Sequence, residues 1–184
     1  MKATGIVRRI DELGRVVIPK EIRRTLRIRE GDPLEIFTER EGGVILKKYS
    51  PIGELSEFAE DFSWALGNVT EHTSLICDKD VVVSAGGENK KDYIGKPISK
   101  TLEKIIEERT AVLKNAQEHD PCIEIIEGEE AGKISAQVIV PILCEGQTIG
   151  AVITLTKKPN QRFSDVEKKT AEVAASFLGA QMAQ

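Results

Sequence analysis

Arginine is concentrated near the start of the chain, and its side chain is suited to binding anions. Residues 1–29 contain nine Lys and Arg against three Asp and Glu, a net charge of +6. A guanidinium group presents several N–H donors in a rigid plane, so it can hold a phosphate or the edge of a guanine with two hydrogen bonds. We expect six of these residues to contact double-stranded DNA: Arg8, Arg9, Arg15, Arg23, Arg24 and Arg27.

The charge is divided unevenly along the 184 residues. Residues 1–50 carry a net charge of +4, whereas residues 51–184 carry −8. A small basic part joined to a larger acidic part is typical of a nucleic-acid-binding domain with an attached control or assembly domain. The turn residues Tyr49–Gly53 mark the change. We therefore predict a DNA-binding domain over residues 1–51 and a second domain over residues 54–184.

The elements that must position the arginines can be read from the first fifty residues. The helix expected there begins at Pro19, whose missing N–H costs nothing at a first helical position, and ends near Leu26. On that helix, Ile22 and Leu26 are four residues apart and would share an inner face. Arg23, Arg24 and Arg27 would lie on the opposite face. The remaining pattern of alternating residues and turns predicts four short strands, over residues 6–10, 15–18, 34–38 and 44–48.

A domain of fifty residues makes a poor monomer, because so short a chain buries too little apolar surface. The three cysteines, Cys77, Cys122 and Cys144, all lie outside this segment, so no disulfide can stabilise it. Oligomerisation is the remaining common solution. We expect two copies of residues 1–50 to interleave into a homodimer with one shared core.

The pattern of residues 54–184 indicates helices packed against one sheet. Ser99 is placed to cap a helix, and Ser164–Glu167 has the sequence of a capping box that opens a last helix. The apolar face of that last helix is predicted to contain Val166, Thr170, Val173, Ala174 and Phe177. The first helix is expected to carry its apolar face between Leu55 and Leu66. Strands are expected over residues 74–77, 81–84, 111–113, 122–126, 134–143 and 148–156.

The N-terminal sequence closely resembles the AbrB family of swapped-hairpin transcription regulators. The resemblance is carried by Thr4–Arg8, Asp11–Pro19, Glu21–Leu26, Leu34–Ile36 and Ile45–Tyr49. It implies a swapped-hairpin β-barrel dimer in an α+β protein. It also implies that DNA is contacted by the arginines at four of the predicted positions: Arg8, Arg15, Arg23 and Arg24.

The whole chain, with this module followed by an α/β domain, resembles the stage V sporulation protein T family. The resemblance implies a GAF-like second domain with a central antiparallel sheet. It also implies a regulator, both activator and repressor, of sporulation genes in the developing forespore. A GAF-like domain suggests that an unknown small ligand is sensed, that a homotetramer is assembled, or both. No cofactor is expected.

Two other functions stay open. Swapped-hairpin modules also occur in antitoxins, although those usually continue into a disordered tail. Some GAF-fold proteins are thiol enzymes, but the spacing of the three cysteines supports neither a catalytic pair nor a zinc site, so we predict no enzyme activity and no metal. No segment is long and apolar enough for a membrane span, and the N-terminus carries no secretory signal, so a cytoplasmic, nucleoid-associated protein is expected. With few candidate base contacts, DNA recognition is expected to depend largely on DNA shape.

Overall fold

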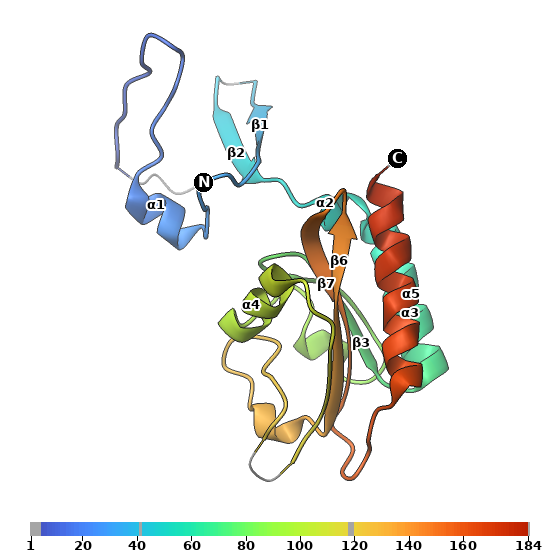
Figure 1. The fold of residues 1–184 in the computed structure, drawn as a ribbon. Coiled ribbons are helices and arrows are strands. Elements are labelled where there is room, and N and C mark those ends of the chain that lie inside the picture. Colours follow the sequence, from blue (N-terminus) through green and yellow to red (C-terminus); the bar gives the residue numbers. More distant parts are fainter. Residues whose placement is uncertain (1–4, 41, 118–119, 184) are drawn as a thin grey trace. The chain divides into compact units, whose positions relative to one another are not determined.

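The computed structural model describes residues 5–40, 42–117 and 120–183. The chain divides into two compact units, residues 1–49 and residues 50–184 (Figure 1). Ser50 begins the second unit by capping a short helix, α2 (Pro51–Glu54), where its side chain accepts a hydrogen bond from the Gly53 N–H at 3.2 Å. The segment expected to be a linker is therefore partly helical.

The first unit contains one helix and a two-stranded sheet. Helix α1 (Lys20–Thr25) begins directly after Pro19. Strands β1 (Leu34–Thr38) and β2 (Val44–Lys48) pair antiparallel, with Ile36 opposite Leu46. Both strands have the predicted limits, and the helix is one residue shorter at its end than predicted.

The two strands predicted over residues 6–10 and 15–18 are not formed within the single chain. The residues run as two extended segments joined by the turn at Asp11–Gly14. Their apolar side chains project into solvent: Val7 is 86% exposed and Val17 is 71% exposed. A strand needs neighbours for its backbone and a core for its apolar face, and one copy of this unit provides neither.

The second unit is built on a five-stranded antiparallel sheet in the order β4-β3-β7-β6-β5 (Figure 1). Two hairpins supply four of the strands, and the positive φ of Gly146 turns the chain between the longest two. The strands are β3 (Thr73–Cys77), β4 (Val82–Gly86), β5 (Val112–Asn115), β6 (Ala136–Cys144) and β7 (Gln147–Thr156).

Helices cover both faces of this sheet (Figure 1). Helices α3 (Ser56–Thr70) and α5 (Asp165–Met182) pack on one face, over a core that includes Val138 and Val152. Helix α4 (Lys100–Glu108) packs on the other, over a core that includes Leu75 and Ile153. Short 3-10 helices lie at η1 (Lys90–Asp92) and η2 (Ala131–Lys133).

The predicted helix starts are confirmed. Ser99 Oγ accepts a hydrogen bond from the Leu102 N–H at 3.0 Å, and Ser164 with Glu167 forms the capping box of α5. The strand predicted over residues 122–126 is wrong: this segment makes one isolated bridge, between Ile98 and Ile126. Its carbonyls instead accept hydrogen bonds from the start of α4, because Ser99 donates to both Glu124 O and Ile125 O.

The predicted buried face of α5 is also wrong in most of its positions. The helix buries mainly small side chains, namely Ala171, Ala174, Ala175, Leu178 and Gly179. The larger residues predicted to be inside lie outside, since Val166 is 70% exposed and Val173 is 66% exposed. Close contact with the sheet is the reason: a side chain added at Gly179 would meet the Leu143 carbonyl oxygen.

Candidate nucleic-acid interface

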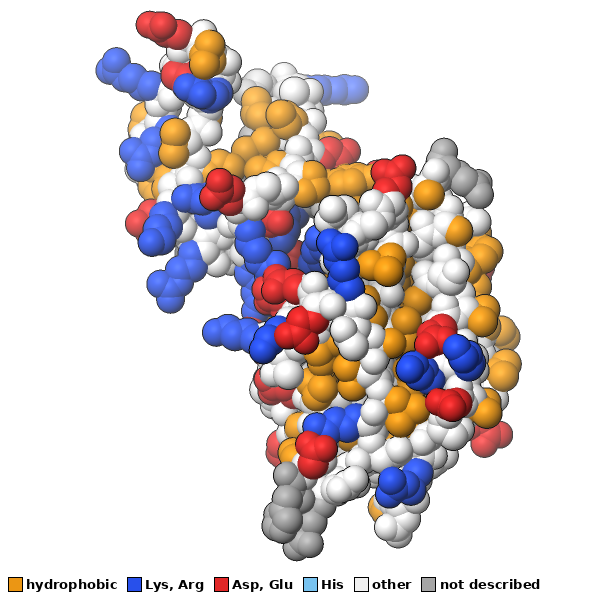
Figure 2. All heavy atoms as spheres, viewed as in Figure 1, with side chains coloured by type: hydrophobic (Ala, Val, Ile, Leu, Met, Phe, Trp, Pro, Cys, Tyr) orange, Lys and Arg blue, Asp and Glu red, His pale blue; other side chains and the backbone are white. Residues whose placement is uncertain are grey.

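The predicted arginines lie on the two extended segments before α1, on α1 itself and directly after it, and none is fully buried. Arg8 and Arg9 precede the turn at residues 11–14 and are exposed. Arg15 follows the turn, with 69% of its side chain exposed. Arg23 and Arg24 occupy the last turn of α1, and Arg27 follows it. On the face of this unit that Figure 2 shows, Lys and Arg side chains project from several places.

The turn between the two extended segments is organised by Asp11. Its Oδ1 accepts hydrogen bonds from the backbone N–H groups of Leu13 at 3.0 Å and Arg15 at 2.9 Å. Its Oδ2 accepts from Arg15 Nε at 2.8 Å. The Arg15 N–H, followed by the Arg15 guanidinium, lowers the pKa of Asp11. The carboxylate therefore stays ionised and holds both the turn and one of the predicted DNA-binding side chains.

Helix α1 carries its arginines at the end where the backbone dipole favours cations. The Arg23 N–H donates to the Pro19 carbonyl at 2.9 Å, which starts the helix, and the Ile28 N–H donates to the Arg23 carbonyl at 2.7 Å, which ends it. Leu26, predicted to lie on an inner face, remains 56% exposed in the single chain. Arg24 is exposed and Arg23 is half-buried, so the helix presents at least one unobstructed guanidinium.

The chain leaves α1 through Arg27, whose backbone is strained, and Lys48 and Asp32 stabilise this region. Arg27 has a positive φ of 52°, a conformation that costs energy for a residue with a side chain. Lys48 Nζ donates to the Arg27 carbonyl at 3.1 Å and pairs with Asp32 Oδ2 at 3.1 Å. Asp32 Oδ2 also accepts from the Arg29 N–H at 2.8 Å. Lys48 thus connects β2 to the end of the arginine-bearing helix.

Sequence reasoning missed the positions of Asp11, Asp32 and Lys48. A recognisable turn signal is an Asp whose side chain can accept a hydrogen bond from the backbone N–H two residues later, with a Gly close behind. This signal could have identified Asp11. Lys48 lies 21 residues from Arg27 in the sequence, and no local pattern predicts that contact.

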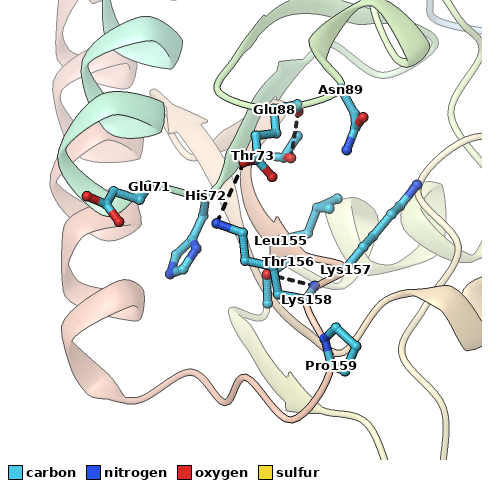
Figure 3. A pocket seen from close by; sticks show the side chains of 10 residues that line it. All are labelled: Glu71, His72, Thr73, Glu88, Asn89, Leu155, Thr156, Lys157, Lys158 and Pro159. Carbon is cyan, nitrogen blue, oxygen red and sulfur yellow. Dashed lines mark hydrogen bonds and ion pairs between the residues drawn. The ribbon is translucent and has the colours of Figure 1, made fainter.

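In the second unit, the loop predicted at residues 86–90 borders a cavity of about 270 Å³ (Figure 3). Thr73 Oγ1 donates to the Glu88 carbonyl at 2.8 Å, and Lys158 Nζ lies 3.7 Å from Glu88 Oε1. The His72 imidazole packs on the Phe163 ring with centroids 4.7 Å apart, and burial lowers the pKa of His72. The cavity thus combines a neutral imidazole with paired charges, and it suits a small polar ligand.

Two of the three cysteines, Cys77 and Cys122, are poorly placed for nucleophilic chemistry. Cys77 is buried, and burial raises the pKa of its thiol to about 12. Cys122 is also buried, which raises its thiol pKa. A thiol must lose its proton to act as a nucleophile, so these two are unreactive at neutral pH. Within residues 5–40, 42–117 and 120–183, no cluster of three or more His, Cys, Asp or Glu is placed to hold a metal ion.

Helices α3 and α5 together form an apolar groove of about 380 Å³ on the surface of the second unit. Phe177 lies against Phe62, with ring centroids 4.8 Å apart, and against Phe58 at 6.1 Å. Val69 is 80% exposed along the same groove. Figure 2 shows hydrophobic side chains gathered along this side of the unit. None of the helices that the structure describes is long and apolar enough to cross a membrane.

Two known families match this arrangement of a basic unit and a helix-covered sheet. Residues 54–183 match the family described as "Stage V sporulation protein T C-terminal, transcription factor". Residues 7–54 match the family described as "Antidote-toxin recognition MazE, bacterial antitoxin". The fold and the longer match define the class of the chain as a two-domain transcription factor.

The individual relatives identify the family. Stage V sporulation protein T of Bacillus subtilis (strain 168) is 51% identical over 184 residues, which is 100% of both chains. The chain belongs to the stage V sporulation protein T family. The transition state regulatory protein AbrB of the same organism is 67% identical over 51 residues, which is 28% of this chain and 52% of AbrB. The predicted AbrB resemblance of the first unit is therefore confirmed.

A solved structure supports the predicted fold of the second unit. The GAF domain of an Acinetobacter phosphoenolpyruvate-protein phosphotransferase is 15% identical, with a TM-score of 0.56. The match covers 74% of this chain and 84% of that one. The likeness shows the fold alone, and it confirms the GAF-like α+β architecture with a central antiparallel sheet.

Proposed function

We propose that the protein regulates transcription by binding double-stranded DNA through the arginines of its first unit, residues 1–51. The observation that carries this proposal is the set of solvent-accessible arginines on a unit that is 67% identical to the matching part of AbrB. Phosphate contacts from these guanidinium groups would release counterions, so binding should weaken steeply as salt is added. Few base contacts are available, which favours recognition of DNA shape and deformability.

The binding unit is proposed to be an intertwined homodimer of residues 1–50. Among the described residues 5–18, the single chain leaves five apolar side chains at least half exposed: Val7, Ile10, Leu13, Val16 and Val17. Exposing so many large apolar groups is costly in water, and a second copy would bury them. The same pairing would supply neighbours for the predicted strands over residues 6–10 and 15–18. It would also double the set of arginines.

The regulated genes are proposed to be sporulation genes in the developing forespore, some activated and some repressed. Membership of the stage V sporulation protein T family supports this assignment. On this proposal the protein acts in the cytoplasm at the nucleoid, and it needs no enzymatic activity.

The second domain, residues 54–184, is proposed to join two DNA-binding dimers into a tetramer, to sense a small ligand, or both. The apolar groove between α3 and α5 supports assembly, because a second copy could cover its exposed Val69 and Val173. The cavity beside His72 supports ligand sensing. Joining two dimers would strengthen DNA binding through effective concentration.

An antitoxin is the second candidate, because residues 7–54 match the MazE antitoxin family. Such a protein would use the chain after its DNA-binding unit to neutralise a toxin. Residues 50–184 instead form a compact unit with two buried cores, which favours the regulator.

The test is fluorescence anisotropy with promoter-derived duplex DNA across a salt series. We expect the intact protein to bind with a steep dependence on salt, and Arg23→Ala/Arg24→Ala to weaken binding by about 100-fold or more. Lys90→Ala/Lys91→Ala is the matched control, because it removes the same charge from exposed positions in the second unit. Equal losses in the two double variants would mean that only net charge matters and would refute the proposed interface.

A further inference from the structure

Asp11 is an acidic residue in the middle of the basic unit, and its carboxylate is fully engaged. It accepts three hydrogen bonds, from the Leu13 N–H, the Arg15 N–H and Arg15 Nε, at 3.0, 2.9 and 2.8 Å. The backbone closes the same turn, since the Asp11 N–H donates to the Arg15 carbonyl at 3.1 Å and the Gly14 N–H donates to the Asp11 carbonyl at 2.9 Å. The turn and the Arg15 side chain are therefore held by one group.

Because Asp11 contacts Arg15 through Nε, the two terminal nitrogens of the guanidinium group remain available to bind DNA. A guanidinium group has five N–H donors, and only the one on Nε is used by Asp11. The four donors on the two terminal nitrogens can still form a paired contact with a guanine edge or a phosphate. The Arg15 side chain is 69% exposed, and among the residues that the structure describes Asp11 alone holds its guanidinium plane. A long side chain fixed before binding loses less rotamer entropy when it binds.

The charge of Asp11 acts in the opposite direction. A carboxylate close to DNA repels phosphates and cancels part of the attraction of Arg15. Asp11 would thus weaken non-specific binding, which depends on net charge. Any benefit must come from the orientation that it gives to Arg15.

We propose that Asp11 is a positioning residue, which holds Arg15 as a rigid two-pronged donor so that the protein discriminates between DNA sequences. This inference rests on the proposed function and deepens it. Glu12 provides the internal comparison: it is the next residue, it is exposed, and it has no hydrogen bond or ion pair within the described chain. Glu12 therefore contributes charge without positioning.

The experiment measures the affinity of the full-length protein for two duplexes by fluorescence anisotropy at one salt concentration. One duplex is the tightest sequence that the intact protein selects from a random pool, and the other is a shuffled version of it. Asp11→Asn keeps an acceptor for the turn but removes the charge and the acceptor for Arg15 Nε. We expect it to bind the selected duplex about ten-fold more weakly and the shuffled duplex equally or more tightly. Glu12→Gln should not weaken either.

Two results would overturn the proposal. If Asp11→Asn tightens binding to both duplexes, as loss of a negative charge alone would, Asp11 does not position Arg15. If Asp11→Asn weakens the Arg15→Ala variant as much as it weakens the parent, Asp11 does not act through Arg15, and its role is only structural. The proposal expects no further loss in that double variant.

Different variants test the proposed function and this inference, so one can be refuted while the other stands. If Arg15→Ala leaves the selected duplex bound as tightly as before, Arg15 is not a DNA contact and the inference falls. Loss of binding in Arg23→Ala/Arg24→Ala would still stand as support for the arginine interface.

Discussion

Asp32 shows how single residues outside the arginine set hold the DNA-binding unit together. It is half-buried between the end of α1 and strand β2, where it contacts the Arg29 N–H and Lys48 Nζ. Burial alone would raise the pKa of Asp32, but these two donors together hold it below its ordinary value. The ionised carboxylate is thus part of the folded unit, and it connects the strained Arg27 region to the sheet.

Removal of the Asp32 charge should lower stability at neutral pH. A carboxylate with a lowered pKa in the folded state contributes stability that is complete above about pH 4 and disappears as the pH falls through the folded pKa. We expect Asp32→Asn to reduce the free energy of unfolding by about 1 kcal/mol at pH 7. The difference should vanish in strong acid. Chemical denaturation at several pH values measures this.

Glu30→Gln is the control for that measurement, because Glu30 is exposed and has no partner within the described residues. It should change stability by less than about 0.5 kcal/mol. A pH-independent loss in Asp32→Asn would contradict the ionic role of Asp32.

Among the elements, α3 and β4 depend on glycine for their close contact. A side chain added at Gly86 would meet the Ser63 carbonyl oxygen at 1.8 Å, and one added at Gly67 would meet the backbone of Gly87 at 2.5 Å. The helix therefore lies directly on the strand backbone. This contact fixes the position of α3, and through α3 it fixes one wall of the apolar groove.

Gly86→Ala should destabilise the second unit by about 3 kcal/mol, because backbone atoms on both sides would have to move apart. Gly132→Ala is the matched control: nothing lies within 4 Å of the added atom, and the same change there should be nearly neutral. Thermal unfolding of both variants provides the comparison. A Gly86→Ala protein as stable as the parent would show that α3 is not packed this closely.

The sequence predicts elements well where the signal is local. Strands β1 and β2 have the predicted limits, because a glycine turn separates two short β-branched runs, and the caps at Ser99 and Ser164 start their helices as expected. The sequence predicts poorly which residues are buried where tertiary packing determines the buried face. The buried face of α5 is made of alanines that permit close approach to the sheet, whereas large apolar residues such as Val173 face outward.

In the candidate site, too, the features with a local sequence signal could be predicted, and the contacts that depend on the folded unit could not. The six candidate arginines stay a prediction from charge. Resemblance to the AbrB family implies four of them, because that signature is continuous in sequence. The contact of Lys48 with the Arg27 carbonyl spans 21 residues, so it depends on the folded unit. The strands predicted over residues 6–10 and 15–18 are not formed in the single chain, and only the proposed dimer would supply their neighbours.

At the scale of the whole molecule, each unit has an exposed apolar surface among its described residues. In the first unit this surface includes Val7, Ile10 and Val17, and in the second it is the groove between α3 and α5. Under the proposed function, a second copy would cover each of these surfaces. Two different two-fold pairings of one chain can close into a tetramer, which is the assembly proposed above.

A charge placed in the groove should separate the tetramer into dimers. Val173 is 66% exposed in the single chain, so Val173→Glu should leave the second unit folded while preventing a copy from packing there. We expect sedimentation velocity to show about half the parent mass. Ile94→Glu is the control, because Ile94 is 49% exposed and lies outside the groove, and it should leave the mass unchanged. A Val173→Glu protein of parental mass would refute assembly through this face.

The central claim is that two copies of residues 1–51 share a core and that the arginines of both copies bind DNA together. Alternation along an extended segment places Val16 opposite Arg15, so Val16 would face that core. The most direct measurement is the affinity of full-length Val16→Asp for promoter-derived duplex DNA, beside Val16→Ile, which keeps the site apolar. Val16 is 50% exposed in one chain, and a charge there would matter little to a monomer. We predict that Val16→Asp loses both DNA binding and the dimer contact, and that Val16→Ile keeps both. If Val16→Asp binds DNA as tightly as the parent protein, the account is contradicted.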